Sequence, residues 1–118
     1  MALHNITGKS GEDAAVNFLQ NQKYKILSRN FKSKVGEVDI VAKERDQVVF
    51  VEVKTRSNTL FGTPGEAIGY KKLISLIKTA QYYLMINNFS QNYRIDAVEV
   101  IMVDGQVKSI NQIKNITL

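Results

Sequence analysis

The chain has 118 residues, of which 44% are hydrophobic and 23% charged, so one folded domain over residues 1–118 is expected rather than a disordered tail. It contains no Cys, which excludes disulfides and thiolate metal sites and fits a cytoplasmic location. No apolar run approaches the roughly 20 residues of a membrane span, and the N-terminus lacks the apolar core of a secretory signal. The net charge of +5 suits either a polyanionic partner or simply a well-solvated surface.

The first half of the chain predicts one helix followed by three strands. The helix is expected over about residues 10–21, because Ser10 can cap it and the acids Glu12 and Asp13 favour its first turn. The strands are expected over residues 24–31, 37–43 and 48–55, with a turn at 33–36. Four polar residues at 44–47 predict an antiparallel hairpin between the second and third strands.

The second half predicts a long helix between strands. Residues 58–67 are typical of a loop leading into a helix, with Thr63 as N-cap, Pro64 at the first helical position and Glu66 as the capping-box acid. This helix should continue to residue 87 or 88. Two strands are expected after it, over residues 92–103 and 106–113, joined by a turn at Asp104–Gly105.

The expected order is therefore α-β-β-β-α-β-β. A strand, a long helix and another strand imply a right-handed crossover, which makes the third and fourth strands parallel neighbours. The sequence predicts an α/β fold with a mixed sheet of about five strands flanked by helices.

Two charged residues lie within an apolar, β-branched strand. Glu52 and Lys54 are one residue apart in VFVEVKTR, so both point from the same face of the strand. Val48 and Phe50 share that face, which argues for partial burial of the two charges. Charged residues are rarely buried unless they are paired, so this placement indicates a function.

The predicted hairpin brings a second carboxylate to Glu52. A pairing centred on residues 44–47 sets Asp39 opposite Glu52, and like charges directly opposite destabilise a sheet. A divalent cation between them removes that conflict, and oxygen ligands without Cys favour Mg²⁺ or Mn²⁺. Lys54 could steady a water or a developing negative charge beside the metal, an arrangement suited to phosphodiester hydrolysis.

Each of these residues also has a structural explanation. Asp39, Glu52 and Lys54 could form an exposed, ion-paired sheet face worth less than about 1 kcal/mol. Glu12 could simply complement the dipole of the first helix. The partial burial expected at Glu52 favours the metal site over the plain ion pair.

Four segments, taken in order, resemble the YraN-type family of small bacterial proteins: GEDAAVNFL, NFKSKVGEVDIVA, VVFVEVKTR and FGTPGEAI. The resemblance covers about residues 8–100. That family is in turn similar to the PD-(D/E)xK nuclease superfamily, and most closely to archaeal Holliday junction resolvases, which bind Mg²⁺ and cut phosphodiester bonds. The positions that match its motif are Glu12, Asp39, Glu52 and Lys54, with Val38 in place of the proline. The resemblance implies that these four are catalytic, that the three acids bind the metal, and that the protein forms a homodimer with a resolvase-like core.

Basic residues flank this acidic set and are candidates for contacts with nucleic-acid phosphates. They are Lys32, Lys34, Arg56, Lys71 and Lys72. Three functions follow: a metal-dependent endonuclease acting on DNA, including branched or structured DNA; a nucleic-acid-binding module without turnover; and a scaffold or interaction protein. The intact acidic set and its lysine favour the endonuclease.

Overall fold

The computed structural model describes residues 3–57, 68–89 and 92–117, which form two helices and five strands. The helices are α1 (Leu3–Asn21) and α3 (Tyr70–Ile86). The strands are β1 (Lys25–Ser33), β2 (Gly36–Glu44), β3 (Gln47–Arg56), β4 (Tyr93–Val103) and β5 (Gln106–Ile113). The predicted order α-β-β-β-α-β-β is confirmed. Neither described helix is both long and apolar enough to cross a membrane.

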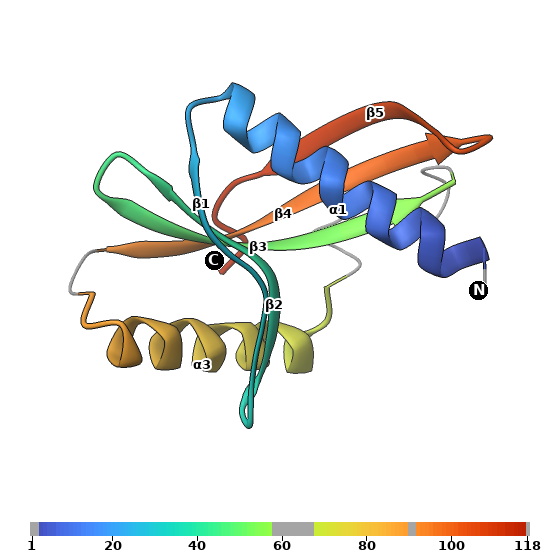
Figure 1. Cartoon of the computed structure of the whole chain (residues 1–118). Coiled ribbons are helices and arrows are strands. Elements are labelled where there is room, and N and C mark those ends of the chain that lie inside the picture. The colour runs from blue at the N-terminus through green and yellow to red at the C-terminus, as the bar shows by residue number, and fades with distance from the viewer. Residues whose placement is uncertain (1–2, 58–67, 90–91, 118) are drawn as a thin grey trace.

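The five strands form one mixed sheet in the order β1-β2-β3-β4-β5 (Figure 1). Neighbouring strands are antiparallel except for β3 and β4, which are parallel, as the crossover rule predicted. The predicted turn at Asp104–Gly105 joins β4 to β5, and both residues have positive φ, 53° and 78°. That backbone geometry matches the twist of a tight antiparallel hairpin.

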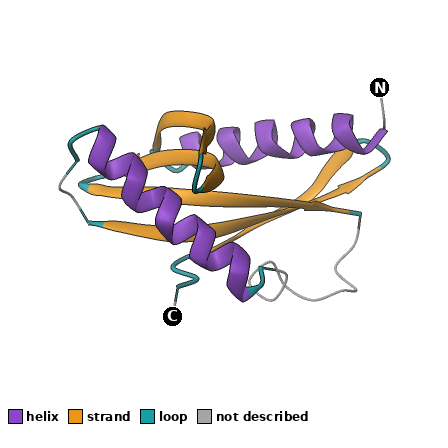
Figure 2. Ribbon diagram, turned by 90° about the horizontal axis from the view of Figure 1, so that it is seen from below, coloured by secondary structure: helices purple, strands orange, loops and turns teal. Residues whose placement is uncertain are grey.

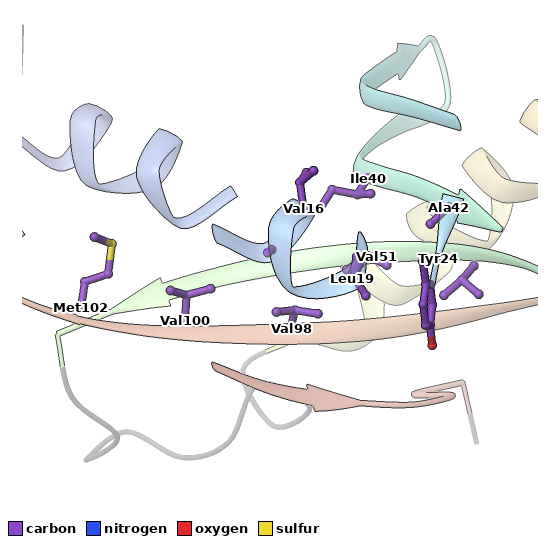
Figure 3. Close-up of a cluster of buried hydrophobic side chains, with 11 residues drawn as sticks. Val16, Leu19, Tyr24, Ile40, Ala42, Val51, Val98, Val100 and Met102 are labelled. Atoms are coloured by element: carbon purple, nitrogen blue, oxygen red, sulfur yellow. The ribbon is translucent and has the colours of Figure 1, made fainter. Parts of the chain in front are cut away.

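The two helices cover opposite faces of the sheet (Figure 2). Val49 and Val51 of β3 belong to the core under α1, which Figure 3 shows in close-up. Val48 and Phe50, which alternate with them, belong to the core under α3. Strand periodicity assigns Glu52 to the same face as Val48 and Phe50, as predicted, and the structure shows that this is the α3 face.

The β1–β2 hairpin bends out of the sheet toward the α3 side and passes α3 at a steep angle (Figure 1). The pairing of β1 with β2 contains a register shift between Ile26 and Ser28. Ile26 packs against the α1-side core, whereas Phe31 packs against the α3-side core. Asn30, between them, has a left-handed backbone with φ 53°. Side chains of β1 therefore pack in both layers of the protein.

The turn of this hairpin is held against α3. The Ser75 hydroxyl donates a hydrogen bond to the Val35 carbonyl, with an O–O distance of 3.2 Å. Gly36 has φ 151°, and a Cβ at this position would lie 2.6 Å from Thr79 Oγ1 and would also meet Ser75 Oγ. The close approach of the turn to α3 therefore requires glycine at position 36.

Helix α1 begins at Leu3, well before the predicted start, so the prediction that Ser10 caps the helix is wrong. Capping preferences are local and weak compared with tertiary packing. Gly11, also inside the helix, is buried against β3, and a Cβ there would lie 3.0 Å from Thr55 Cβ and would meet Thr55 Oγ1. Packing against the sheet therefore stabilises the helix through Ser10 and Gly11, where the sequence predicted that it would begin.

Helix α3 begins at Tyr70, with Gly69 in an extended conformation as its N-cap. The prediction of one continuous helix from Pro64 is therefore wrong at residues 68–69. Glycine loses more backbone entropy in a helix than any other residue, so it favours a break at this point. The loop predicted at 58–67, with the capping roles of Thr63, Pro64 and Glu66, lies outside the described residues.

A buried polar cluster on the α1 side joins β4 and β5 to Tyr24, the residue before β1. Arg94 donates to both carboxylate oxygens of Asp96, at 2.9 and 3.2 Å, and to the Tyr24 hydroxyl at 2.7 Å. Gln112 donates to Asp96 at 2.9 Å, and so does the backbone N–H of Asn115. Asp96 is fully buried, and its bonds account for its place in the core without any catalytic role.

Candidate functional site

Asp39 lies where β2 separates from β3. The last pair of the β2–β3 ladder is Ile40 with Val51, in the predicted register, and Asp39 is one residue beyond it. Its carboxylate Oδ2 accepts a hydrogen bond from the backbone N–H of Val53, with an N–O distance of 2.7 Å. The side chain of Asp39 thus occupies the place that a β2 carbonyl would take if the ladder continued.

Glu52 lies beside Asp39 with its side chain directed to the α3 face of β3. It is 5% exposed. The pKa of Glu52 is raised to about 7: burial is the largest cause, the charge of Asp39 and a hydrogen bond with its carboxyl act in the same direction, and Lys72 and Lys54 act in the opposite direction. The predicted closeness of the two carboxyls is therefore present.

Two lysines contact the same oxygen of Glu52. Lys54 Nζ lies 3.9 Å from Glu52 Oε2, and Lys72 Nζ lies 3.4 Å from it. From the sequence, Lys72 was predicted only as a contact for nucleic-acid phosphates. The signal that could have found it is helical spacing, because Lys72 precedes the buried residues Leu76 and Thr79 by four and seven positions on one stripe of α3. A lysine on the inward stripe of a helix needs an acidic partner.

Glu12 reaches the site from the other layer. The pKa of Glu12 is raised by burial and by the charge of Asp39, against the effects of a hydrogen bond with Asn30 and the charge of Arg29. Arg29 Nη2 is 3.8 Å from Glu12 Oε1. The charge of Asp39 therefore acts on both Glu12 and Glu52, which come from opposite sides of the sheet, and the bend of the β1–β2 hairpin makes this arrangement accessible.

The donor set fits a hard divalent cation. Asp39 and Glu52 offer carboxylate oxygens only, and Mg²⁺ is commonly held by one or two carboxylates together with waters and substrate phosphates. The contact between these two like-charged groups is what a cation would stabilise. Within residues 3–57, 68–89 and 92–117, no three His, Cys, Asp or Glu side chains are grouped closely enough to hold a metal ion.

The remaining basic candidates differ in how exposed they are. Lys32, Lys34 and Lys71 are exposed, the first two on the β1–β2 hairpin and the third on the first turn of α3. Arg56 is largely buried, with Nε 3.5 Å from Oε2 of the buried Glu99. Glu99 was not predicted as a site residue, although it is a charged residue within an apolar strand, which is the same signal that marked Glu52.

The fold and the site together define an α/β protein with a five-stranded mixed sheet and a carboxylate–lysine cluster where β2 separates from β3. Residues 11–100 match the model of the uncharacterised protein family UPF0102, and the chain belongs to this family. This membership confirms the family resemblance seen in the four sequence segments.

Relatives in several bacteria cover nearly the whole chain. The UPF0102 protein of Caldicellulosiruptor saccharolyticus is 50% identical over 110 residues, which are 92% of this chain and 93% of that protein. The UPF0102 proteins of Clostridioides difficile and Alkaliphilus oremlandii are 44% identical over 109 residues and 43% identical over 111 residues. Each alignment covers 92% of this chain, with 93% and 94% of the respective relative.

Proposed function

We propose that this protein is a metal-dependent nuclease of the PD-(D/E)xK type that hydrolyses phosphodiester bonds in DNA, with branched or otherwise structured DNA as the first substrates to test. The observation that carries the proposal is the buried Glu52 carboxyl, in contact with the Asp39 carboxyl and with two lysines. Two acids and a lysine on neighbouring strands are the groups that metal-assisted phosphodiester hydrolysis requires.

Each site residue has a role in the proposed reaction. Asp39 and Glu52 would hold Mg²⁺ or Mn²⁺, and Glu12 would act beside them as a further acid. When bound, the ion supplies Lewis-acid polarisation of the phosphate and lowers the pKa of a water. Lys54 would orient that water and stabilise the negative charge that develops on the phosphate oxygens. Phosphates on either side of the cleaved bond would contact Lys32, Lys34, Arg56, Lys71 and Lys72.

The test is cleavage of linear, flapped and four-way DNA in the presence of Mg²⁺ or Mn²⁺. We expect nicking of at least one substrate, its loss in Glu52→Gln and Asp39→Asn, and no change in Lys78→Met, which removes an exposed charge elsewhere on α3. Metal titration by calorimetry should show binding to the native chain and none to Glu52→Gln. Survival of every substrate, with metal present, counts against the nuclease.

A second candidate is a nucleic-acid-binding module without turnover. Lys54 and Lys72 already compensate the charge of Glu52, which a site without metal would need. This function predicts salt-sensitive binding to DNA or RNA that is the same with and without Mg²⁺ and persists in Glu52→Gln. Fluorescence anisotropy against increasing salt separates the two candidates, because the nuclease should bind DNA more tightly when the divalent ion is present.

A further inference from the structure

Lys72 lies against the carboxyl that a metal ion would bind in the proposed nuclease. Its Nζ is 3.4 Å from Glu52 Oε2, closer than the 3.9 Å of Lys54 Nζ to the same oxygen. The two lysines therefore neutralise the carboxyl that the proposed nuclease needs as a metal ligand. A divalent cation on Glu52 would repel Lys72, because both carry positive charge and would lie a few ångströms apart.

Lys72 is also able to leave. Its side chain is 37% exposed, and it extends from the first turn of α3 on a flexible four-carbon stem. The hairpin turn is anchored one turn further along α3, through Ser75 and Val35, so movement of the lysine side chain does not require the helix to move. The Lys72 ammonium can therefore leave the Glu52 carboxylate and pair with another anion nearby.

We propose that Lys72 is an internal counter-ion of Glu52 and that cation binding at Asp39 and Glu52 transfers it to a phosphate of the nucleic acid. This inference rests on the proposed function and adds a regulatory property to it. Cation binding and phosphate binding are coupled, because the ion displaces a lysine that the phosphate then pairs with. Without the cation, Lys72 remains on Glu52 and contributes little to nucleic-acid affinity.

The neighbouring Lys71 provides a matched control. It is exposed on the same turn and takes part in none of the ion pairs found among the described residues. Replacing Lys71 or Lys72 by Met removes the same formal charge from α3. Only Lys72→Met removes a positive charge that contacts Glu52, the carboxyl that would hold the metal.

The first experiment is titration of the full chain with Mn²⁺ alone in an alkaline buffer, followed by calorimetry. Lys72→Met should bind Mn²⁺ roughly threefold to tenfold more tightly than the native chain, because a competing cation is gone. Lys71→Met and the charge-retaining Lys72→Arg should stay close to the native affinity. Unchanged or weaker Mn²⁺ binding by a folded Lys72→Met protein overturns the inference and leaves the nuclease proposal standing.

The second experiment measures binding of a short fluorescent DNA duplex with Ca²⁺ and without divalent ions. With Ca²⁺, Lys72→Met should lose roughly threefold to tenfold in DNA affinity, whereas without divalent ions it should bind DNA about as tightly as the native chain. An equal loss in both conditions contradicts the coupling. If the native chain binds neither Mn²⁺ nor Ca²⁺, both the proposed function and this inference fail. If the native chain binds the metal but Lys72→Met binds it no more tightly, only this inference fails.

Discussion

The Asp39 carboxylate accepts a 2.7 Å hydrogen bond from the backbone N–H of Val53, at the point where β2 separates from β3. This bond satisfies a backbone donor that would otherwise lose its partner when the ladder ends. It also holds Asp39 beside Glu52, although two carboxyls side by side repel each other. The backbone thus helps to stabilise a contact that electrostatics alone would separate.

The raised pKa of Glu52 makes stability depend on pH in a defined direction. Its value of about 7 in the folded protein lies above the ordinary 4.5, so the folded state binds the proton more tightly than the unfolded state. The resulting stability is full below about pH 4.5 and is lost as pH rises through about 7. Without divalent ions, Glu52→Gln should therefore gain about 3 kcal/mol of unfolding free energy relative to the native chain over this interval.

Urea unfolding of both proteins across this pH range measures the effect. Glu44→Gln is the control, because the Arg94 hydrogen bond and charge lower the pKa of Glu44 even though burial opposes them. The stability that Glu44 contributes is present above its ordinary pKa and is lost as pH falls, so its variant should show a difference of opposite slope. A difference between native and Glu52→Gln proteins that does not vary with pH contradicts the assignment.

Two glycines with positive φ should respond differently to alanine. Gly105 has a φ of 78° and open space around it, so Gly105→Ala should lower the unfolding free energy by about 1–2 kcal/mol through the backbone conformation alone. Gly36→Ala should cost a further 1–3 kcal/mol, roughly, because its Cβ also meets Ser75 and Thr79 of α3. Thermal unfolding of both variants tests this. Equal losses would show that the hairpin turn does not pack closely on α3.

Gly11 sets how closely α1 approaches the sheet. Alanine usually stabilises a helix by about 1 kcal/mol over glycine, yet Gly11→Ala should destabilise by about 1–3 kcal/mol, because the new Cβ overlaps Thr55. The helix would move outward and carry Glu12 away from Asp39. In a double-mutant cycle, adding Thr55→Ala should recover part of the unfolding free energy that Gly11→Ala loses. A stabilising Gly11→Ala would show that the two elements are further apart.

The buried Arg94 cluster should be far more sensitive than a surface ion pair. Arg94→Met leaves the fully buried Asp96 without its guanidinium partner and should cost about 3–5 kcal/mol in unfolding free energy. Arg29→Met breaks the exposed 2.8 Å pair with Asp13 and should cost less than about 1 kcal/mol. Denaturant titration of the two variants compares them directly. Similar values would mean that Asp96 gains enough from Gln112 and Asn115 alone.

Much of the fold could be predicted because its signals are local. Alternation along β3 identified the two faces of that strand, and the short polar turn at 44–47 established the pairing that continues to Ile40 and Val51. The strand at Gln106–Ile113 agrees with its predicted bounds. The helix starts at Leu3 and Tyr70 were predicted wrongly, because helix ends depend on packing as well as on capping residues.

The sequence by itself determined the element order, the pairing of the second to fifth strands and the placement of Glu52 and Lys54 on one half-buried face, since strand period and turn length are properties of neighbouring residues. Only the tertiary structure decided that β2 separates from β3 at Asp39 and that Lys72 of α3 contacts Glu52. Those contacts join segments that are distant in the chain, and their geometry depends on how a helix packs on a bent hairpin and on the sheet.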